Sequence, residues 1–199
     1  MTMKRYNSFG LNSEFYDLLD TGDMIGVGDV SNSMFSRLIR FTTRSSISHV
    51  AVVVKNPPYH CKGLYILEAN SDEMHVHCIP FAFFLAQYKH ATFYYRKINF
   101  QRSTEFYLNF YHLFNNAIGK PYLMDFLRFA LAECASNTPT KVFLSPQKFF
   151  CSSLCTYIYK SLAMISKDID PERITPSEIF EGDIIDTNNI SEIKVLLSK

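Results

Sequence analysis

The apolar positions in the first half of the chain follow the pattern of β-strands. Residues 48–54, "SHVAVVV", form a β-branched run that predicts a strand, and the "NPPYHCKG" after it predicts a turn-rich connection. Residues 64–70, 74–81 and 91–100 are predicted as three further strands. Upstream, residues 15–30 are interpreted as a short helix or loop that ends at "DTGD", followed by an apolar strand "MIGVG".

The remaining elements show helical spacing of apolar residues. This spacing predicts a short amphipathic helix over 31–47 and another helix after residue 100, which "GKP" at 119–121 ends. A further helix is expected at about 150–165. The stretch "DPERITPSEIFEGD" predicts a turn and a short helix, and "EIKVLL" a last edge strand.

The order of these elements predicts the fold class. Strands cluster in the middle of the chain and helices lie towards its ends, which is typical of an α+β fold rather than a βαβ one. At 199 residues, with no repeat and no linker rich in Gly, Pro or Ser, the chain is expected to form a single domain. The stretch 123–147 is interpreted as an excursion that forms a lid or an insertion.

Composition and charge exclude several function classes. A net charge of +1 argues against nucleic acid as a partner, since phosphate binding needs a surplus of Lys and Arg. The start "MTMKRYNSFG" lacks a signal-peptide core, and the longest apolar run, at 79–86, is far shorter than the roughly 20 residues of a membrane span. Five cysteines without framework spacing indicate free thiols in a reducing compartment. A cytoplasmic location is expected, either in the producing cell or after delivery into another.

Cys151 is the first candidate for chemistry. It stands where the helix at 150–165 should begin, and the unpaired N–H groups and dipole of a helix N-terminus favour a thiolate. Cys155 lies one turn further on and should face the core, while Cys61, Cys78 and Cys134 have no comparable electropositive surroundings. From position alone, the alternative that Cys151 is an inert buried residue stays open.

A cysteine nucleophile needs a base and a group that orients the base, and His49 and Glu68 are the candidates. His49 opens the strand at 48–54, and Glu68 lies near the end of the strand at 64–70. A symmetric hairpin would pair His49 with Ala69, so a shared face requires a bulge or an offset in the loop between the strands. The alternatives are that His49 is a core histidine and Glu68 a solvent-exposed charge at a strand end.

Two further stretches have competing interpretations. "DEMHVHC" at 72–78 places His75 and His77 on one face of a strand, which is compatible with a metal site or with surface polar residues. No second ligand pair accompanies them, so no metal is expected. The aromatic run "IPFAFFLAQY" is interpreted as core. The alternative is that Phe81, Phe83 and Phe84, together with the segment 126–132, line an acyl-chain pocket or a peripheral membrane surface.

Several short motifs together resemble one family. "TGDMIGV", "SHVAVVV", "LYILEAN", "GKPY", "FFCSSLCTYIY" and "ITPSEIF" occur in the order seen in the circularly permuted papain-like cysteine hydrolases. These are the permuted NlpC-type proteins, which include the bacterial YiiX-like group and a poxvirus relative and are akin to lecithin:retinol acyltransferase. The similarity covers roughly residues 20–180. It implies a permuted papain-like fold, with a central antiparallel sheet packed against helices and the nucleophile at a helix N-terminus.

The resemblance also implies roles for individual residues. Cys151 would be the nucleophile, His49 the base, Glu68 the orienter of the imidazole, and Tyr122 an aromatic that lines the site. Where the family often has an acid after the "CS" pair, this chain has Ser153, a departure that bears on local packing.

The function implied is hydrolysis of an amide or acyl bond, in a peptide, an isopeptide or an N-acyl lipid, through a thioester acyl-enzyme and without a cofactor. The alternatives are an acyltransferase of the lecithin:retinol type and a non-catalytic binding protein that retains the fold.

Overall fold

The computed structural model describes residues 13–28, 45–122 and 148–198, and its centre is a six-stranded sheet. All strand pairs are antiparallel and follow the order β4-β3-β2-β1-β5-β6. The strands are β1 (Met24–Gly28), β2 (Ile47–Lys55), β3 (Leu64–Asn70), β4 (His75–Pro80), β5 (Thr92–Arg96) and β6 (Lys194–Leu197).

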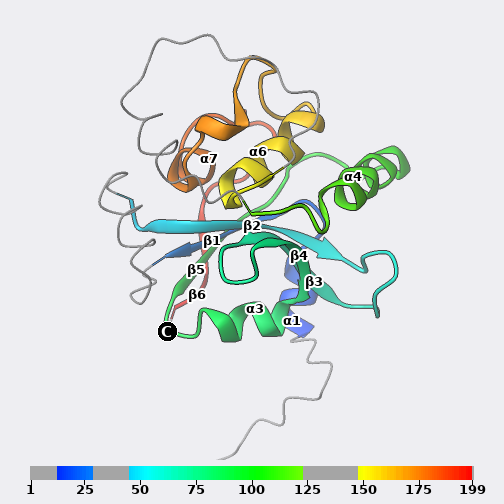
Figure 1. The fold of residues 1–199 in the computed structure, drawn as a ribbon, viewed down its shortest axis with the longest axis vertical. Helices are drawn as coiled ribbons and strands as arrows, with labels where there is room; N and C mark the ends of the chain where they lie inside the picture. The colour runs from blue at the N-terminus through cyan, green and yellow to red at the C-terminus, as the bar shows by residue number, and fades with distance from the viewer. Residues whose placement is uncertain (1–12, 29–44, 123–147, 199) are drawn as a thin grey trace, which may run out of the picture.

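Helices cover both faces of this sheet (Figure 1). One face carries α4 (Thr104–Ala117), α6 (Cys151–Ser161) and α7 (Pro176–Glu181), with the 3-10 helix η1 (Pro171–Arg173) packed against α6; the other carries α1 (Ser13–Leu18) and α3 (Phe81–Gln87). Strand β2 contributes side chains to the hydrophobic core on both faces of the sheet. Val50 and Val52 pack towards α6, while Ala51 and Val53 pack towards α3. The predicted α+β class and the antiparallel sheet packed against helices are confirmed.

Most predicted elements are present, and two end earlier than expected. The strand at 64–70 has the predicted limits, whereas the one predicted over 91–100 ends at Arg96. Beyond it the pairing is reduced to an isolated bridge between Ile98 and Ile190. Two backbone N–H groups there donate to side chains: that of Lys97 to Ser191 Oγ, and that of Ile98 to the Asp23 carboxylate. The helix predicted to end near residue 165 ends at Ser161.

The prediction of a helix over 31–47 is wrong at its C-terminal end. Ile47 is the first residue of β2, where it pairs with Gly28 of β1, so ladder hydrogen bonding takes the place of a helical turn. The rest of that prediction, up to residue 44, lies outside the described residues, as does the predicted lid or insertion at 123–147.

The aromatic stretch that follows β4 forms α3 and is mainly core. Phe81 and Phe84 are buried in the layer between the sheet and α3, while Phe83 is 67% exposed. The interpretation of this run as core is confirmed for the two buried rings. The segment 126–132, proposed with it as a lipid-facing surface, lies outside the described residues. Among the helices that the structure describes, none has an apolar stretch long enough to cross a lipid bilayer.

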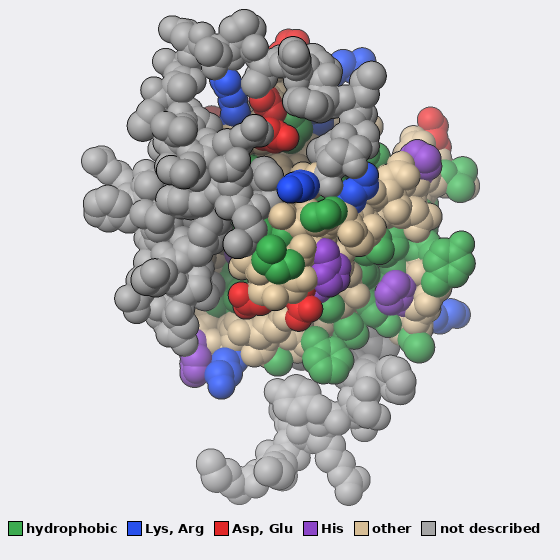
Figure 2. Space-filling view, in the orientation of Figure 1, with side chains coloured by type: hydrophobic (Ala, Val, Ile, Leu, Met, Phe, Trp, Pro, Cys, Tyr) green, Lys and Arg blue, Asp and Glu red, His purple; other side chains and the backbone are tan. Residues whose placement is uncertain are grey.

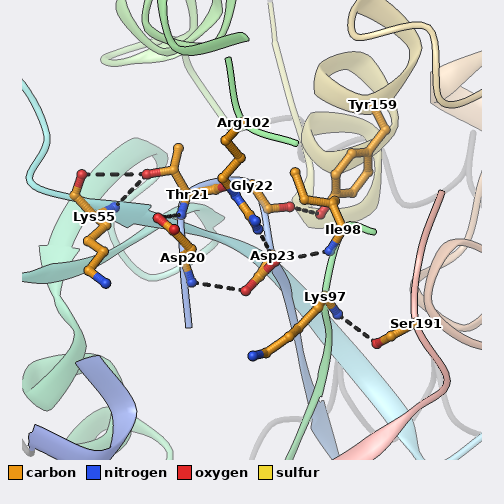
Figure 3. A network of polar contacts seen from close by, with 10 residues as sticks. All are labelled: Asp20, Thr21, Gly22, Asp23, Lys55, Lys97, Ile98, Arg102, Tyr159 and Ser191. Carbon is orange, nitrogen blue, oxygen red and sulfur yellow. Dashed lines mark hydrogen bonds and ion pairs between the residues drawn. The ribbon is translucent and has the colours of Figure 1, made fainter. Parts of the chain in front are cut away.

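A buried carboxylate fixes the start of the central strand β1. Asp23 accepts hydrogen bonds from the backbone N–H groups of Asp20, at 2.9 Å, and Ile98, at 3.0 Å, and forms an ion pair with Arg102 (Figure 3). Burial raises the pKa of Asp23, and the charge of Arg102 offsets part of that rise. The "TGD" motif is therefore a structural turn that precedes β1.

The same turn anchors α6 to the sheet. The phenol of Tyr159, on α6, donates a 2.8 Å hydrogen bond to the carbonyl of Gly22 (Figure 3). Close packing fixes the neighbouring helix α7, because a Cβ on Gly26 of β1 would lie 2.8 Å from the ring of Phe180. Helices α6 and α7 are thus held at defined positions over β1 and β2.

Candidate active site

Cys151 is the first residue of α6, as the sequence predicts. The residue before it, Phe150, has extended backbone angles, and its carbonyl accepts the first helical hydrogen bond from the N–H of Leu154 at 3.0 Å. Cys151 is 4% exposed, and Cys155 one turn further on is fully buried. The prediction that Cys155 faces the core is confirmed, and Cys151 lies at the positive end of the helix dipole.

Ser153 closes the N-terminus of this helix. Its hydroxyl accepts a 3.0 Å hydrogen bond from the backbone N–H of Phe150 and lies 3.0 Å from the carbonyl of that residue. In a capping box a Glu or Gln at this third helical position makes the same bond back to the N-cap. Ser153 therefore caps the helix without adding a negative charge beside the thiol.

His49 lies at a β-bulge in β2. On the neighbouring strand β1, Val27 pairs with His49 and the next residue, Gly28, pairs with Ile47, so Ser48 is the extra residue of the bulge. Bulges redirect side chains at the ends of strands. The side chain of His49 is 12% exposed.

The register between β2 and β3 brings His49 and Glu68 together. Val52 pairs with Leu67 and Lys55 with Leu64, one residue away from the symmetric hairpin that would have separated the two side chains. As a result Nε2 of His49 lies 2.5 Å from Oε2 of Glu68. The offset that the sequence required is present in the loop between the strands.

Glu68 is a fully buried carboxylate with several donors around it. His49 Nε2 contacts one oxygen and His77 Nε2 contacts the other at 2.9 Å, while Asn70 Nδ2 and the hydroxyl of Tyr88 lie at 3.3 and 3.4 Å. Burial alone would raise the pKa of this carboxyl group, but the hydrogen bonds and charges of the two histidines outweigh it and lower the pKa to about 2. The alternative of a solvent-exposed charge at a strand end is therefore wrong.

His49 lies between Glu68 and Cys151. Burial lowers its pKa, but the charge of Cys151 and a hydrogen bond to its side chain, together with the hydrogen bond and charge of Glu68, raise it to about 10. Because Nε2 contacts the carboxylate, Nδ1 is the nitrogen left for the thiol. The ring of Tyr88 stacks on the imidazole at a centroid distance of 5.4 Å. The structure thus brings the three predicted residues together, with His49 in the middle.

Tyr122 lies near enough to Cys151 for the two side chains to interact electrostatically. It is buried, it forms a parallel bridge with Phe149, and its N–H donates to the carbonyl of Met74 at 2.8 Å. Burial raises the pKa of Tyr122, and the charges of Cys151 and Asp72 raise it further. Its predicted role as an aromatic residue that lines the site stays a prediction. Figure 2 shows acidic and histidine side chains beside hydrophobic ones in the centre of the face seen there.

Sequence reasoning missed two residues of this site, His77 and Tyr88. His77 was considered only as a metal ligand or a surface residue, although Glu68 and His77 are directly paired in the β3–β4 hairpin. The short turn between these strands is a signal that could have predicted this pair. Tyr88 follows the end of α3, and nothing in the apolar pattern distinguishes it from the other aromatic residues of that segment.

Each histidine of this region contacts a protein oxygen through one of its ring nitrogens. Both histidine Nε2 atoms point at the carboxylate of Glu68, and Nδ1 of His75 contacts the carbonyl of Glu73. Within residues 13–28, 45–122 and 148–198 there is no group of three or more His, Cys, Asp or Glu side chains that could hold a metal.

Comparison with known proteins shows a similarity of fold. No protein-family model and no curated protein matches the chain. A solved structure does: YiiX from Escherichia coli O157:H7, described as a metalloprotein of DUF1105, is 18% identical, with a TM-score of 0.55. The likeness covers 90% of this chain and 97% of that one. The chain therefore has a YiiX-like fold.

Proposed function

We propose that this protein is a cysteine-dependent hydrolase that cleaves an amide or acyl bond through a thioester acyl-enzyme. Cys151 is the nucleophile, His49 the general base and acid, and Glu68 the group that orients the imidazole. The observation that carries the proposal is the position of His49, which contacts the buried carboxylate of Glu68 at 2.5 Å and the side chain of Cys151. This is the relation between nucleophile, base and orienting group that acyl transfer requires.

The charge states around His49 favour an ion pair before substrate binds. With a pKa of about 10, His49 is protonated at neutral pH, and Glu68, with a pKa of about 2, is ionised. An imidazolium at His49 is stabilised by the ionised carboxylate of Glu68 beside it. The proton that a serine hydrolase moves during attack is therefore already on His49 when the reaction begins.

The first half of the reaction forms the acyl-enzyme. The Cys151 thiolate attacks the carbonyl carbon, and the electron pair of the C=O bond moves to the oxygen. The backbone N–H of Cys151, at the first position of α6, is placed to donate to this oxyanion, an interaction worth about 3 kcal/mol in similar sites. As the tetrahedral intermediate collapses, the bond to the leaving group breaks and His49 gives its proton to that group.

The second half returns the enzyme to its starting state. Neutral His49 takes a proton from water, the hydroxide adds to the thioester carbonyl, and the C–S bond breaks to release the acid and the thiolate. No step requires a metal or an organic cofactor. An amine or alcohol that takes the place of water would make the protein an acyltransferase, so acceptor dependence of the product distinguishes the two activities.

The substrate class follows from the resemblance of the sequence motifs: a peptide, an isopeptide or an N-acyl lipid. A reducing compartment such as the cytosol is the proposed location, because Cys61, Cys78, Cys151 and Cys155 are all free in the part of the chain that the structure describes. A thiolate nucleophile needs such conditions to stay reduced.

The test is covalent capture of the acyl-enzyme. The protein is incubated with a panel of activated acyl esters and peptide thioesters, and intact-mass spectrometry follows the adduct on wild type, Cys151→Ser and His49→Ala. We expect an acyl adduct on Cys151 that forms and then decays in the wild type, forms at least about 100-fold more slowly in His49→Ala, and is absent as a thioester in Cys151→Ser. Equal acylation of wild type and His49→Ala would contradict the proposal.

A further inference from the structure

A second histidine contacts the carboxylate of the proposed triad. Nε2 of His77 lies 2.9 Å from Oε1 of Glu68, and Nε2 of His49 lies 2.5 Å from Oε2. The two imidazoles therefore bind the two oxygens of one carboxyl group. A carboxylate that only had to orient His49 would need a single imidazole, so the second one calls for an explanation.

The burial of Glu68 makes this second contact important. Its side chain is fully buried, so no bulk water reaches either oxygen, and an ionised carboxylate in such a place must be hydrogen-bonded within the protein. Besides His77, the partner of Oε1 is the amide of Asn70 at the longer distance of 3.3 Å. His77 thus supplies the shorter of the two hydrogen bonds to this oxygen.

The geometry of the β3–β4 hairpin fixes the direction of this bond. Glu68 and His77 are directly paired across the ladder, so both side chains project on the same face from neighbouring backbones. Because Glu68 is ionised and accepts, His77 donates through its Nε2–H. With Oε1 held by His77, rotation of the carboxyl group is restricted and Oε2 stays directed at His49.

From these contacts we infer that His77 is a positioning residue of the proposed active site, which acts through Glu68 to hold the imidazole of His49 against Cys151. The inference rests on the proposed function and adds a fourth residue to the series of contacts Cys151–His49–Glu68.

The test uses two amide variants that differ by one methylene. In His77→Gln the Nε2 amide occupies the place of the imidazole Nε2 and reaches Glu68, whereas in His77→Asn the amide is too short. The matched control is His75→Asn, on the same strand, because His75 contacts the carbonyl of Glu73 and not Glu68. Long-range ¹H–¹⁵N NMR follows the titration of the His49 imidazole, and mass spectrometry follows iodoacetamide alkylation of Cys151 at pH 7.

We expect His77→Asn to lower the titration midpoint of His49 by about one pH unit and to slow alkylation of Cys151 about tenfold. His77→Gln and His75→Asn should stay within about twofold of wild type in rate. A merely structural role would lower the melting temperature without moving the His49 midpoint. An unchanged or raised His49 midpoint in His77→Asn would overturn the inference. So would an equal decrease of the Cys151 alkylation rate in His77→Gln and His77→Asn.

The two readouts also separate this inference from the proposed function. If His49→Ala leaves the alkylation rate of Cys151 unchanged, the proposed function is wrong, whatever His77 does. If His49→Ala slows alkylation and His77→Asn leaves both the rate and the His49 midpoint at their wild-type values, only the positioning role is wrong.

Discussion

The ring of Tyr88 stacks on the imidazole of His49, with centroids 5.4 Å apart and planes inclined by 25°. The same tyrosine donates a 3.4 Å hydrogen bond to Glu68 Oε2, the oxygen that also contacts His49. An aromatic residue after α3 therefore covers the His49–Glu68 contact and keeps water from it. Electrostatic interactions are stronger where water is excluded, so this cover strengthens the bond that orients the base.

Removal of the Tyr88 ring should weaken the base. We expect Tyr88→Ala to slow alkylation of Cys151 by iodoacetamide about tenfold, a change of about 1.4 kcal/mol. The control is Tyr88→Phe, which keeps the ring and removes only the long hydrogen bond to Glu68, and it should remain within about threefold of wild type. If the alkylation rate falls as much in Tyr88→Phe as in Tyr88→Ala, the hydroxyl group matters and the exclusion of water by the ring does not.

Acid stability should depend on Glu68. Its pKa of about 2 in the folded protein lies below the ordinary value of 4.5, so the carboxylate stabilises the fold fully above pH 4.5. That contribution is lost as the pH falls from 4.5 towards 2, because the unfolded chain takes up the proton first. We expect the free energy of unfolding of wild type to fall by about 2–3 kcal/mol more than that of Glu68→Gln over this range.

Urea titrations at several pH values measure this difference. Comparison with Glu68→Gln isolates the contribution of one carboxyl group from those of others, such as Asp23, whose pKa burial raises. Parallel pH curves for the two proteins would contradict the low pKa of Glu68.

Alkaline stability should depend on His49. Its folded pKa of about 10 lies above the ordinary 6.5, so the imidazolium stabilises the fold fully below pH 6.5, and this contribution is lost as the pH rises towards 10. In His49→Gln this pH dependence should be absent. Unfolding free energies measured from pH 6 to 10 test this, and a wild-type curve that follows the variant's would show that His49 is neutral in the folded protein.

The N-terminus of α6 should depend on Ser153. Its hydroxyl accepts the backbone N–H of Phe150 at 3.0 Å, so Ser153→Ala should cost about 1 kcal/mol and lower the melting temperature by about 2–4 °C. Ser153→Glu restores the acid of a capping box and should keep the melting temperature near that of wild type. Calorimetry compares the three proteins, and a Ser153→Ala variant as stable as wild type would show that the cap is dispensable.

The sequence was informative where side-chain pattern and chain order determine the result. The run of valines after His49 predicted β2, and the spacing of cysteines in "CSSLC" predicted which thiol begins the helix and which faces the core. The pairing of His49 with Glu68 could be stated only as a condition, since a shift of one residue between strands moves a side chain to the opposite face. That register depends on how the loop at residues 55–64 folds, which local pattern does not reveal.

Two other partners of Glu68 were not predicted from the sequence, for a related reason. His77 reaches the carboxylate through pairing of β3 with β4, and Tyr88 reaches it from the end of a helix packed on the sheet. The Tyr88 contact depends on tertiary packing, whereas the His77 contact depends on the register of the β3–β4 hairpin, whose short turn the sequence does indicate. The end of β5 at Arg96 was missed in the same way, because side chains from distant segments, Asp23 and Ser191, take the hydrogen bonds that would have extended the strand.

The most direct test of the account compares one buried thiol with one exposed thiol. A brief pulse of iodoacetamide at pH 7 is followed by peptide mass spectrometry of Cys151, which is 4% exposed, and of the exposed Cys61, in wild type and in His49→Ala. The account predicts that Cys151 reacts faster than Cys61 in the wild type and at least about tenfold more slowly in His49→Ala, with Cys61 unchanged. Faster reaction of Cys61 in the wild type, with Cys151 unaffected by the loss of His49, would contradict it.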